Sequence, residues 1–262
     1  MKNKIDKILI NSGIEDYGFC LFGEVGELIN CGAVKRLPKN AQTIISVIFP
    51  YKVKNSPPLN ISRYSAVEDY HTVCMKILEK AALELKKNFK EFSFAPFVDN
   101  SPINEVKAAA LCGLGVIGKN NLLISHKYGS FVFLGEIVTD LKINTQANKI
   151  LSCINCNRCV DSCPTTFLNK KKLCLSDITQ KKKITPEMEV IIKENNYVWG
   201  CDICQEVCPM NNKKPLTKIK EFKISYRNFF SPDESFEDRA YTWRGEEVIK
   251  RNFNILKDNK KA

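Results

Sequence analysis

Eight of the twelve cysteines lie between residues 153 and 208, in a spacing that is typical of iron–sulfur proteins. The first group has the pattern C-x2-C-x2-C-x3-C-P, with which bacterial ferredoxins hold a [4Fe-4S] cluster while the fourth cysteine binds a second cluster. A zinc site is disfavoured, because zinc ligands usually occur as pairs about 12 to 20 residues apart. The cysteines of this group are Cys153, Cys156, Cys159 and Cys163, and Pro164 follows them.

The second cysteine group is one ligand short of a complete ferredoxin pattern. It has the pattern C-x2-C-x3-C-P, and Cys174, which lies between the two groups, is expected to supply the missing ligand. A structural role for Cys174 would instead leave one cluster incomplete. The exchange of ligands between ferredoxin groups assigns Cys153, Cys156, Cys159 and Cys208 to one cluster, and Cys163, Cys174, Cys201 and Cys204 to the other.

Two such clusters carry electrons and are not catalytic by themselves. The simplest hypothesis is therefore a ferredoxin-type electron carrier. However, residues 153–208 make up only about a fifth of the 262 residues. The long segment before them is expected to contain the group that receives the electrons.

The bulk composition is that of a soluble globular protein, with 44% hydrophobic and 26% charged residues. The N-terminus has no signal-peptide pattern, and no apolar run approaches the roughly 18 residues of a membrane span. A cytoplasmic protein without a membrane segment is therefore expected, and its thiols stay reduced rather than forming disulfides. The net charge of +11 suits a polyanion such as nucleic acid, or equally a lysine-rich solvated surface.

Hydrophobic periodicity before the cysteines predicts α/β layers. Strands are expected at residues 42–51, 92–99 and 130–141, and an amphipathic helix over residues 61–90. A second helix is expected to have Ser101 as its cap and Pro102 as its first residue, and to end at Gly113.

The stretch GLGVIGKN at residues 113–120 matches the dinucleotide-binding fingerprint G-x-G-x-x-G. That fingerprint has meaning only between a strand and a following helix, whereas this stretch follows a predicted helix and precedes strand-like NLLI. Lys119 is followed by Asn120, so a P-loop is also excluded. A bound NAD is not expected, and the glycines are expected to let the backbone approach another bulky ligand closely.

The sequence D-x-H-x-x-C around His71 is one glycine short of a motif that supplies an axial histidine to cobalamin. His71 lies within the predicted amphipathic helix, where a histidine is more often a core residue. An axial ligand at this position is not expected.

The order of several motifs resembles the epoxyqueuosine reductase family of tRNA-modifying enzymes. The resemblance runs from about residue 40 to residue 212 and extends to WRGEEVIKRN in the tail. The motifs are ISRYSAVEDYH, VDNSPINEVKAAALCGLGVIGKNNLLI, GSFVFLGEIVTDL, CINCNRCVDSCPTTFL, CLSDITQ and GCDICQEVCPMN.

The resemblance implies a nitroreductase-like α/β cobalamin domain at residues 1–145 and a ferredoxin-like double [4Fe-4S] domain at 146–215. A C-terminal tail at 216–262 is expected to pack back on this body. The implied reaction reduces epoxyqueuosine to queuosine at the wobble position of tRNA, with cobalamin bound base-off and without an axial histidine. The implied partners are the epoxyqueuosine-modified anticodon stem-loop and an electron donor such as a flavodoxin or ferredoxin, and a monomer is expected.

The aspartate of the family's V-D-x-x-P motif is Asp99, and the resemblance implies that it donates the proton. Opening the epoxide leaves an alkoxide, which is a poor leaving group unless an acid protonates it. Burial that raises the pKa of Asp99 toward neutrality would suit this role, although a helix cap is the alternative role for Asp99. Lys181, Lys182 and Lys183 could meet phosphate or form a solvated charge run. The cobalamin contacts implied by matching motifs are Arg63, Asp99, Leu123, Leu134, Gln180 and Asp202.

Two departures from the family pattern concern the tail and Cys112. Longer members carry a C-terminal helical-repeat extension that helps to grip tRNA, and this sequence stops at Ala262 without one. Cys112 is interpreted as a small core residue. Two other functions stay open: a corrinoid iron–sulfur reductase of small molecules, similar to reductive dehalogenases, and a non-catalytic electron carrier.

Overall fold

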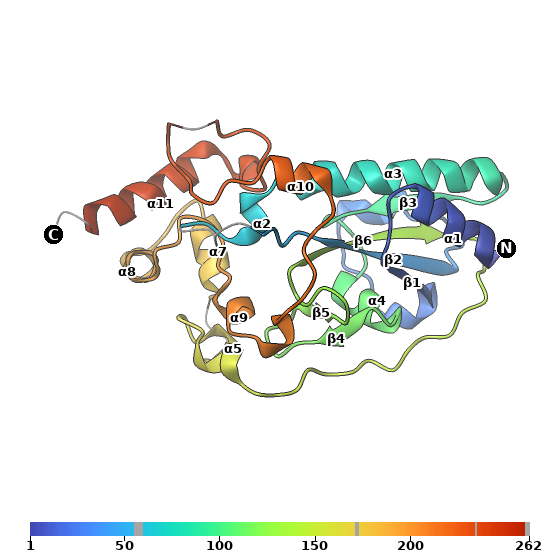
Figure 1. Cartoon of the computed structure of the whole chain (residues 1–262), viewed down its shortest axis with the longest axis horizontal. Helices are drawn as coiled ribbons and strands as arrows, with labels where there is room; N and C mark the ends of the chain where they lie inside the picture. Colours follow the sequence, from blue (N-terminus) through green and yellow to red (C-terminus); the bar gives the residue numbers. More distant parts are fainter. Residues whose placement is uncertain (55–59, 171–172, 234, 260–262) are drawn as a thin grey trace. The chain divides into compact units, whose positions relative to one another are not determined.

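The chain folds into two compact units, which Figure 1 draws in a computed structural model. The structure describes residues 1–54, 60–170, 173–233 and 235–259. The first unit contains Met1–Pro50 and His71–Ile154, and the second unit contains Tyr51–Tyr70 and Asn155–Ala262.

The second unit includes a short segment that the expected division places in the first domain. The backbone N–H of Val198 donates to the carbonyl of Asn60 at 2.7 Å, and the N–H of Ser62 donates to the carbonyl of Trp199 at 2.8 Å. These hydrogen bonds attach the segment around residue 60 to the unit that carries most of the cysteines. The compact units therefore differ from a division at residues 145 and 215.

The first unit is built on an antiparallel sheet. Glu136 lies in one of the two inner strands, with Ser46 of one neighbouring strand and Phe97 of the other opposite it. A carboxyl therefore lies in the interior of the sheet. The strands, in the order in which they pair, are β1 (Tyr17–Leu21), β2 (Thr43–Pro50), β6 (Val132–Thr139) and β3 (Phe94–Phe97).

Helices cover both faces of this sheet, which explains why every residue of β2 is buried. Leu78 of α3 (Tyr70–Asn88) lies on one face, where a Cβ on Gly135 would come within 2.8 Å of it. On the other face, α4 (Glu105–Leu111) packs into an apolar core with Ile44 and Val138, and Figure 1 shows the two helices on opposite sides of the sheet. The other elements of the unit are α1 (Lys2–Asn11), η1 (Phe22–Val25), η2 (Gly32–Arg36), β4 (Gly115–Ile117) and β5 (Leu123–Ser125).

The strands expected at residues 42–51, 92–99 and 130–141 are confirmed by β2, β3 and β6. The single helix expected over residues 61–90 is wrong, because it is divided into α2 (Arg63–Ala66) and α3. Val67 is extended, with φ −93° and ψ 171°. The N–H of Asp69 donates to the carbonyl of Asp238 at 2.9 Å, so a tertiary hydrogen bond replaces a helical one at the break.

The start of α4 also differs from the prediction. Asn104, not Ser101, is the N-cap: its side-chain oxygen accepts the N–H of Lys107 at 3.0 Å. The Ser101 hydroxyl instead accepts the N–H of Ile103 at 3.2 Å, which forms a tight turn before the helix. The end of the helix is as expected, because Gly113 follows with φ +77°.

Replacing Asn104 by alanine is expected to lower the free energy of unfolding by about 1 kcal/mol, because the first turn of α4 loses its cap. Asn104→Asp keeps an oxygen acceptor and should retain the wild-type value. Urea denaturation under anaerobic conditions measures both variants. Equal stability of Asn104→Ala and Asn104→Asp would show that the cap contributes nothing.

The glycines of GLGVIGKN serve the packing of the chain on itself. A Cβ on Gly115 would lie 2.4 Å from the carbonyl oxygen of Ile124 in the facing strand of the β4–β5 hairpin. A Cβ on Gly118 would lie 2.3 Å from the side-chain oxygen of Asn120. The close neighbours of these two glycines are therefore parts of the hairpin, where a bulky ligand was expected.

The second unit is mainly helical around a buried aromatic core. Trp199 is fully buried, and its ring meets Tyr241 edge-on at 5.9 Å. Asn252 donates to the carbonyls of Thr179 and Val198 at 2.7 and 2.8 Å, which fixes the C-terminal helix to this core. Besides α2, the helices are α5 (Arg158–Asp161), α6 (Phe167–Lys170), α7 (Leu175–Gln180), α8 (Pro186–Asn195), α9 (Ile203–Glu206), η3 (Pro209–Asn211), α10 (Lys220–Ile224), η4 (Thr242–Arg244) and α11 (Glu246–Asn259).

Across the described residues, no helix has both the length and the hydropathy needed to cross a membrane.

Candidate active site and cluster ligands

Asp99 lies in the loop that joins β3 to α4. Its backbone is in the left-handed region, with φ +57°. Its N–H donates to Oε1 of Glu105 at 3.0 Å. The Asp99 side chain is 60% exposed, so the burial that would suit a proton donor is not provided by the protein alone.

His71 faces the same carboxyl from the first turn of α3. Its Nε2 lies 3.4 Å from Oδ2 of Asp99, and its side chain is only partly buried. The prediction of a core histidine is therefore wrong. The tertiary fold brings His71 and Asp99 together although 28 residues separate them.

Glu105 is the residue of this site that the sequence analysis missed. Its carboxyl is partly buried under the Asp99 loop. Burial raises the pKa of Glu105 to about 7, and repulsion by Asp99 adds to this, while the Asp99 N–H and His71 oppose it. The sequence could have indicated Glu105 by one feature: it lies in the first turn of the helix that follows the V-D-x-x-P motif.

A further carboxyl, Glu136, lies beneath this site in the central strand β6. It is fully buried, and the Ser101 side chain lies near enough to oppose the rise in its pKa, although no hydrogen bond of ordinary geometry reaches its oxygens among the described residues. Burial raises the pKa of Glu136 well above its ordinary value, and the nearby Glu105 carboxyl raises it further. The environment of Glu136 therefore favours the neutral form of its carboxyl.

Replacing Glu136 by glutamine should remove a pH dependence of stability. A carboxyl whose pKa is raised by folding stabilises the protein below its unfolded pKa, and this contribution is lost as pH rises toward the folded pKa. The free energy of unfolding of the wild type should therefore fall, relative to that of Glu136→Gln, by about 1.4 kcal/mol for each pH unit between about 4.3 and the folded pKa. Urea denaturation at pH 5 and pH 8 measures the difference, with Glu84→Gln on the surface of α3 as the control. A difference between wild type and Glu136→Gln that does not change with pH would contradict the burial argument.

Two of the expected cofactor contacts lie in the first unit. Leu123 of β5 is buried, and Leu134 of β6 packs against the same core as Phe97. Leu134 is two residues before Glu136 in the strand, so the two side chains lie on the same face. Phe97 leads directly into the Asp99 loop, so this apolar core lies at the base of the loop.

The other expected contacts lie in the second unit, where hydrogen bonds connect two of them. The Arg63 backbone N–H donates to Oδ2 of Asp202 at 2.5 Å, and the Arg63 guanidinium pairs with Glu206. Burial raises the pKa of Asp202 to about 7, and the Arg63 N–H opposes the shift. The Gln180 side chain donates to the Tyr64 hydroxyl at 3.4 Å, one residue along from Arg63. These side chains therefore gather around α2.

The cysteines expected to hold clusters form no disulfides, and all of them lie in the second unit except Cys153, which belongs to the first. Burial raises the pKa of Cys201 to about 12, and the neighbouring thiols of Cys204 and Cys174 contribute to this. Cys174 is therefore close to Cys201 and Cys204, although 27 residues separate it from Cys201 along the chain. Among the described residues, no three His, Cys, Asp or Glu side chains converge as ligands of a single metal ion.

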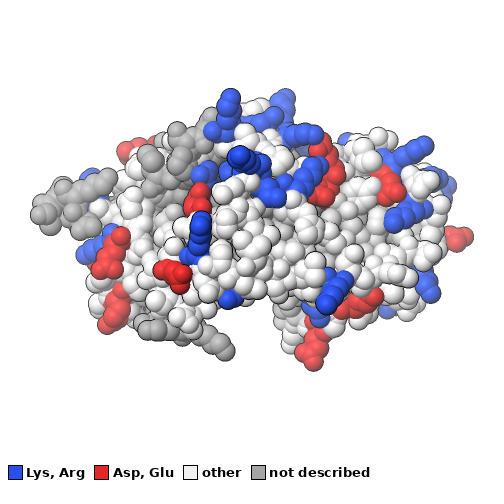
Figure 2. Space-filling view, turned by 60° about the horizontal axis from the view of Figure 1, so that its bottom comes forward, with Lys and Arg blue, Asp and Glu red and all other residues white. Residues whose placement is uncertain are grey.

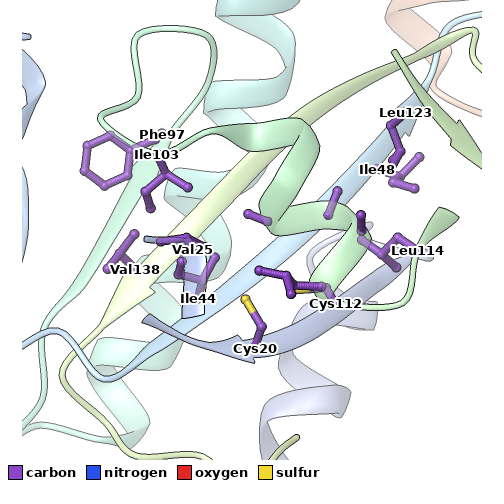
Figure 3. Close-up of a cluster of buried hydrophobic side chains, with 14 of the residues drawn as sticks. Cys20, Val25, Ile44, Ile48, Phe97, Ile103, Cys112, Leu114, Leu123 and Val138 are labelled. Carbon is purple, nitrogen blue, oxygen red and sulfur yellow. The ribbon is translucent and has the colours of Figure 1, made fainter. Parts of the chain in front are cut away.

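Two of the isolated cysteines outside these groups lie in the apolar core of the first unit. Cys20 of β1 and Cys112 after α4 are both buried, and Figure 3 shows their side chains within one hydrophobic cluster. Burial raises the pKa of Cys112 well above its ordinary value, and a hydrogen bond with Cys20 adds to this. The interpretation of Cys112 as a small core residue is consistent with this position.

An α/β unit with an open carboxyl site, joined to a cysteine-rich helical unit, defines an iron–sulfur oxidoreductase. Residues 152–211 match the family model of a 4Fe-4S double cluster binding domain. Residues 32–100 match the family model described as "Epoxyqueuosine reductase QueG, DUF1730".

Comparisons that cover most of the chain agree with these matches. An epoxyqueuosine reductase of Lactococcus garvieae is 36% identical over 243 residues, which cover 82% of this chain and 68% of the relative. The solved epoxyqueuosine reductase of Streptococcus thermophilus is 29% identical with a TM-score of 0.80, over 99% of this chain and 81% of that one. Another epoxyqueuosine reductase, solved with an epoxyqueuosine-modified tRNA-Tyr stem loop, has the same fold with a TM-score of 0.80 at 24% identity, over 97% of this chain and 80% of that one. The chain belongs to the epoxyqueuosine reductase family.

Proposed function

We propose that this protein reduces epoxyqueuosine to queuosine at the wobble position of tRNA, with Asp99 as the proton donor. The observation that carries the proposal is the combination, in one chain of this family, of an open Asp99 carboxyl with a double-cluster domain. The net change removes the epoxide oxygen as water: two electrons and two protons are consumed, both C–O bonds break, and an alkene remains.

Asp99 can perform the acid step because its carboxyl is exposed and held by its surroundings. A proton passed from Asp99 to the opened epoxide oxygen makes that oxygen a better leaving group. His71 lies on one side of the carboxyl, and Glu105 holds the backbone on the other. These contacts orient the acid toward the solvent-exposed side, where the substrate must bind.

The cysteine set suits [4Fe-4S] clusters because its members have the ferredoxin spacing and form no disulfides. The approach of Cys174 to Cys201 supports a cluster ligated by Cys163, Cys174, Cys201 and Cys204. The other cluster is proposed on Cys153, Cys156, Cys159 and Cys208.

Cobalamin is proposed as the electron acceptor of the clusters, bound base-off without an axial histidine. When bound, it supplies the two electrons in a reduced cobalt state. Leu123 and Leu134 belong to the apolar cluster that also contains Phe97, two residues before Asp99, and this supports an apolar ligand near the Asp99 loop. The residues proposed to hold it are Arg63, Asp99, Leu123, Leu134, Gln180 and Asp202.

The charge of the protein supports tRNA as the substrate. The net charge is +11, and Lys and Arg outnumber Asp and Glu on the face drawn in Figure 2. Such an excess attracts a phosphate backbone and strengthens binding at low salt. The related fold that accommodates a modified stem loop supports the same substrate.

The remaining features are proposed from the resemblance to the family. The protein is proposed to act as a monomer in the cytoplasm and to receive electrons from a flavodoxin or ferredoxin. The proposed functional division has a catalytic domain at residues 1–145 and a cluster domain at 146–215. The tail at 216–262 is proposed to pack back on this body.

A complementation experiment tests the proposed function. A bacterial strain that lacks its own epoxyqueuosine reductase accumulates epoxyqueuosine in tRNA, and expression of this protein should restore queuosine. Mass spectrometry of digested tRNA measures the ratio of the two nucleosides. Unchanged epoxyqueuosine in cells that produce the cluster-loaded protein would favour a corrinoid iron–sulfur reductase of small molecules instead.

A further inference from the structure

The Asp99 loop is held in place at two points, by the side chains of Glu105 and Arg36. Oε1 of Glu105 accepts the Asp99 N–H at 3.0 Å. On the other side, the Arg36 guanidinium donates to the carbonyl of Asn100 at 2.8 Å and lies over the Phe97 ring at 4.4 Å. The loop is therefore fixed immediately before and after the Cα of Asp99.

This support matters because the Asp99 backbone is strained. Its φ of +57° lies in the left-handed region, which costs energy for residues other than glycine. The hydrogen bond to Glu105 offsets part of this cost, because it satisfies the Asp99 N–H only when the loop turns in this way. A change at Glu105 should therefore alter the direction in which the Asp99 carboxyl points.

Glu105 also acts on Asp99 through charge. Burial raises the pKa of Glu105 to about 7, and the Asp99 carboxylate repels it. The titratable groups that face Glu105 are Asp99 from the loop, His71 from α3 and Glu136 from β6. Two carboxyls that repel each other titrate as a pair and retain one proton more readily than either would alone.

We propose that Glu105 is a positioning residue for the proton donor: its carboxyl holds the Asp99 main chain and keeps a proton on the Asp99–Glu105 pair. The inference deepens the proposed function and rests on it for the role of Asp99. An exposed aspartate alone loses its proton well below neutral pH, and the neighbouring carboxyl counteracts this loss.

The pH dependence of turnover tests this role. Glu105→Gln keeps an oxygen that accepts the Asp99 N–H but cannot ionise, whereas Glu105→Ala loses both properties. The alkaline limb of kcat should move to lower pH in Glu105→Gln, so that its rate at pH 8 falls about tenfold or more while the KM for tRNA stays within about twofold. Glu105→Ala should be slower at every pH, and Glu84→Gln should match the wild type. A wild-type pH profile in Glu105→Gln would overturn the inference.

Infrared titration of the full chain with its clusters provides a readout that does not depend on activity. The wild-type spectrum minus that of Glu105→Gln should show a carboxyl band that disappears near pH 7. In Asp99→Asn this transition should move to lower pH, because the repelling charge is gone. The absence of such a band, or a band that Asp99→Asn leaves unmoved, would overturn the inference. A wild type that has the band but does not reduce epoxyqueuosine would contradict the proposed function and leave the Asp99–Glu105 coupling established.

Discussion

Asp99→Asn should reduce the rate of oxygen removal from epoxyqueuosine-containing tRNA by about 100-fold or more, because general acid catalysis contributes on that scale. Asparagine has nearly the same shape and keeps the backbone N–H that donates to Glu105. The loss should therefore lie in kcat, and the affinity for tRNA should stay close to that of the wild type. Single-turnover kinetics with reduced enzyme measure the chemical step separately from binding.

The control for this variant is the state of its clusters and cofactor. Iron content, visible absorption and cobalamin binding should equal those of the wild type, since Asp99 is no cluster ligand in this account. Glu84→Gln, an exposed carboxyl on α3, should keep the full rate. An Asp99→Asn enzyme that works at the wild-type rate would exclude Asp99 as the proton donor. The next candidate would be His71, whose Nε2 lies 3.4 Å from Oδ2 of Asp99.

Cys174→Ala should abolish turnover and reduce the iron content by about half, because one of two [4Fe-4S] clusters loses a ligand. The expectation rests on the spacing of the cysteines and on the approach of Cys174 to Cys201 and Cys204. Iron analysis and electron paramagnetic resonance of the reduced protein measure the number of clusters.

Cys31→Ala is the matched control, since Cys31 is a partly buried cysteine outside both ferredoxin groups. It should keep both clusters and the wild-type rate. A full iron content in Cys174→Ala would show that Cys174 is structural and that one cluster takes its fourth ligand from another residue.

The cluster domain could be predicted from the sequence because its signal is local. The spacing of Cys153, Cys156 and Cys159 is fixed by a single cubane, so a short window contains the information. Cys174 could be assigned only by counting ligands, and its approach to Cys201 required the folded chain. Strands such as β2 were also predictable, because a buried strand is a continuous apolar run.

The surroundings of Asp99 could not be predicted from sequence patterns, because they depend on tertiary contacts. His71 was expected in a core because its helical stripe is apolar, but α3 begins only one residue earlier, and its first turn faces the Asp99 loop. Ser101 and Pro102 have the composition of a helix start, but the Ser101 hydroxyl makes a turn and Asn104 caps the helix. Because the helix begins three residues later than predicted, Glu105 is in its first turn and lies beneath the Asp99 loop.

The most direct test of the central claim is the conversion of epoxyqueuosine in tRNA by the purified protein under anaerobic conditions. The protein is loaded with clusters and cobalamin, reduced, and mixed with epoxyqueuosine-containing tRNA, whose nucleosides are then analysed by mass spectrometry. The modified nucleoside should lose one oxygen mass with the wild type and not with Asp99→Asn. Intact epoxyqueuosine after incubation with a reduced, fully loaded wild-type enzyme would contradict this claim.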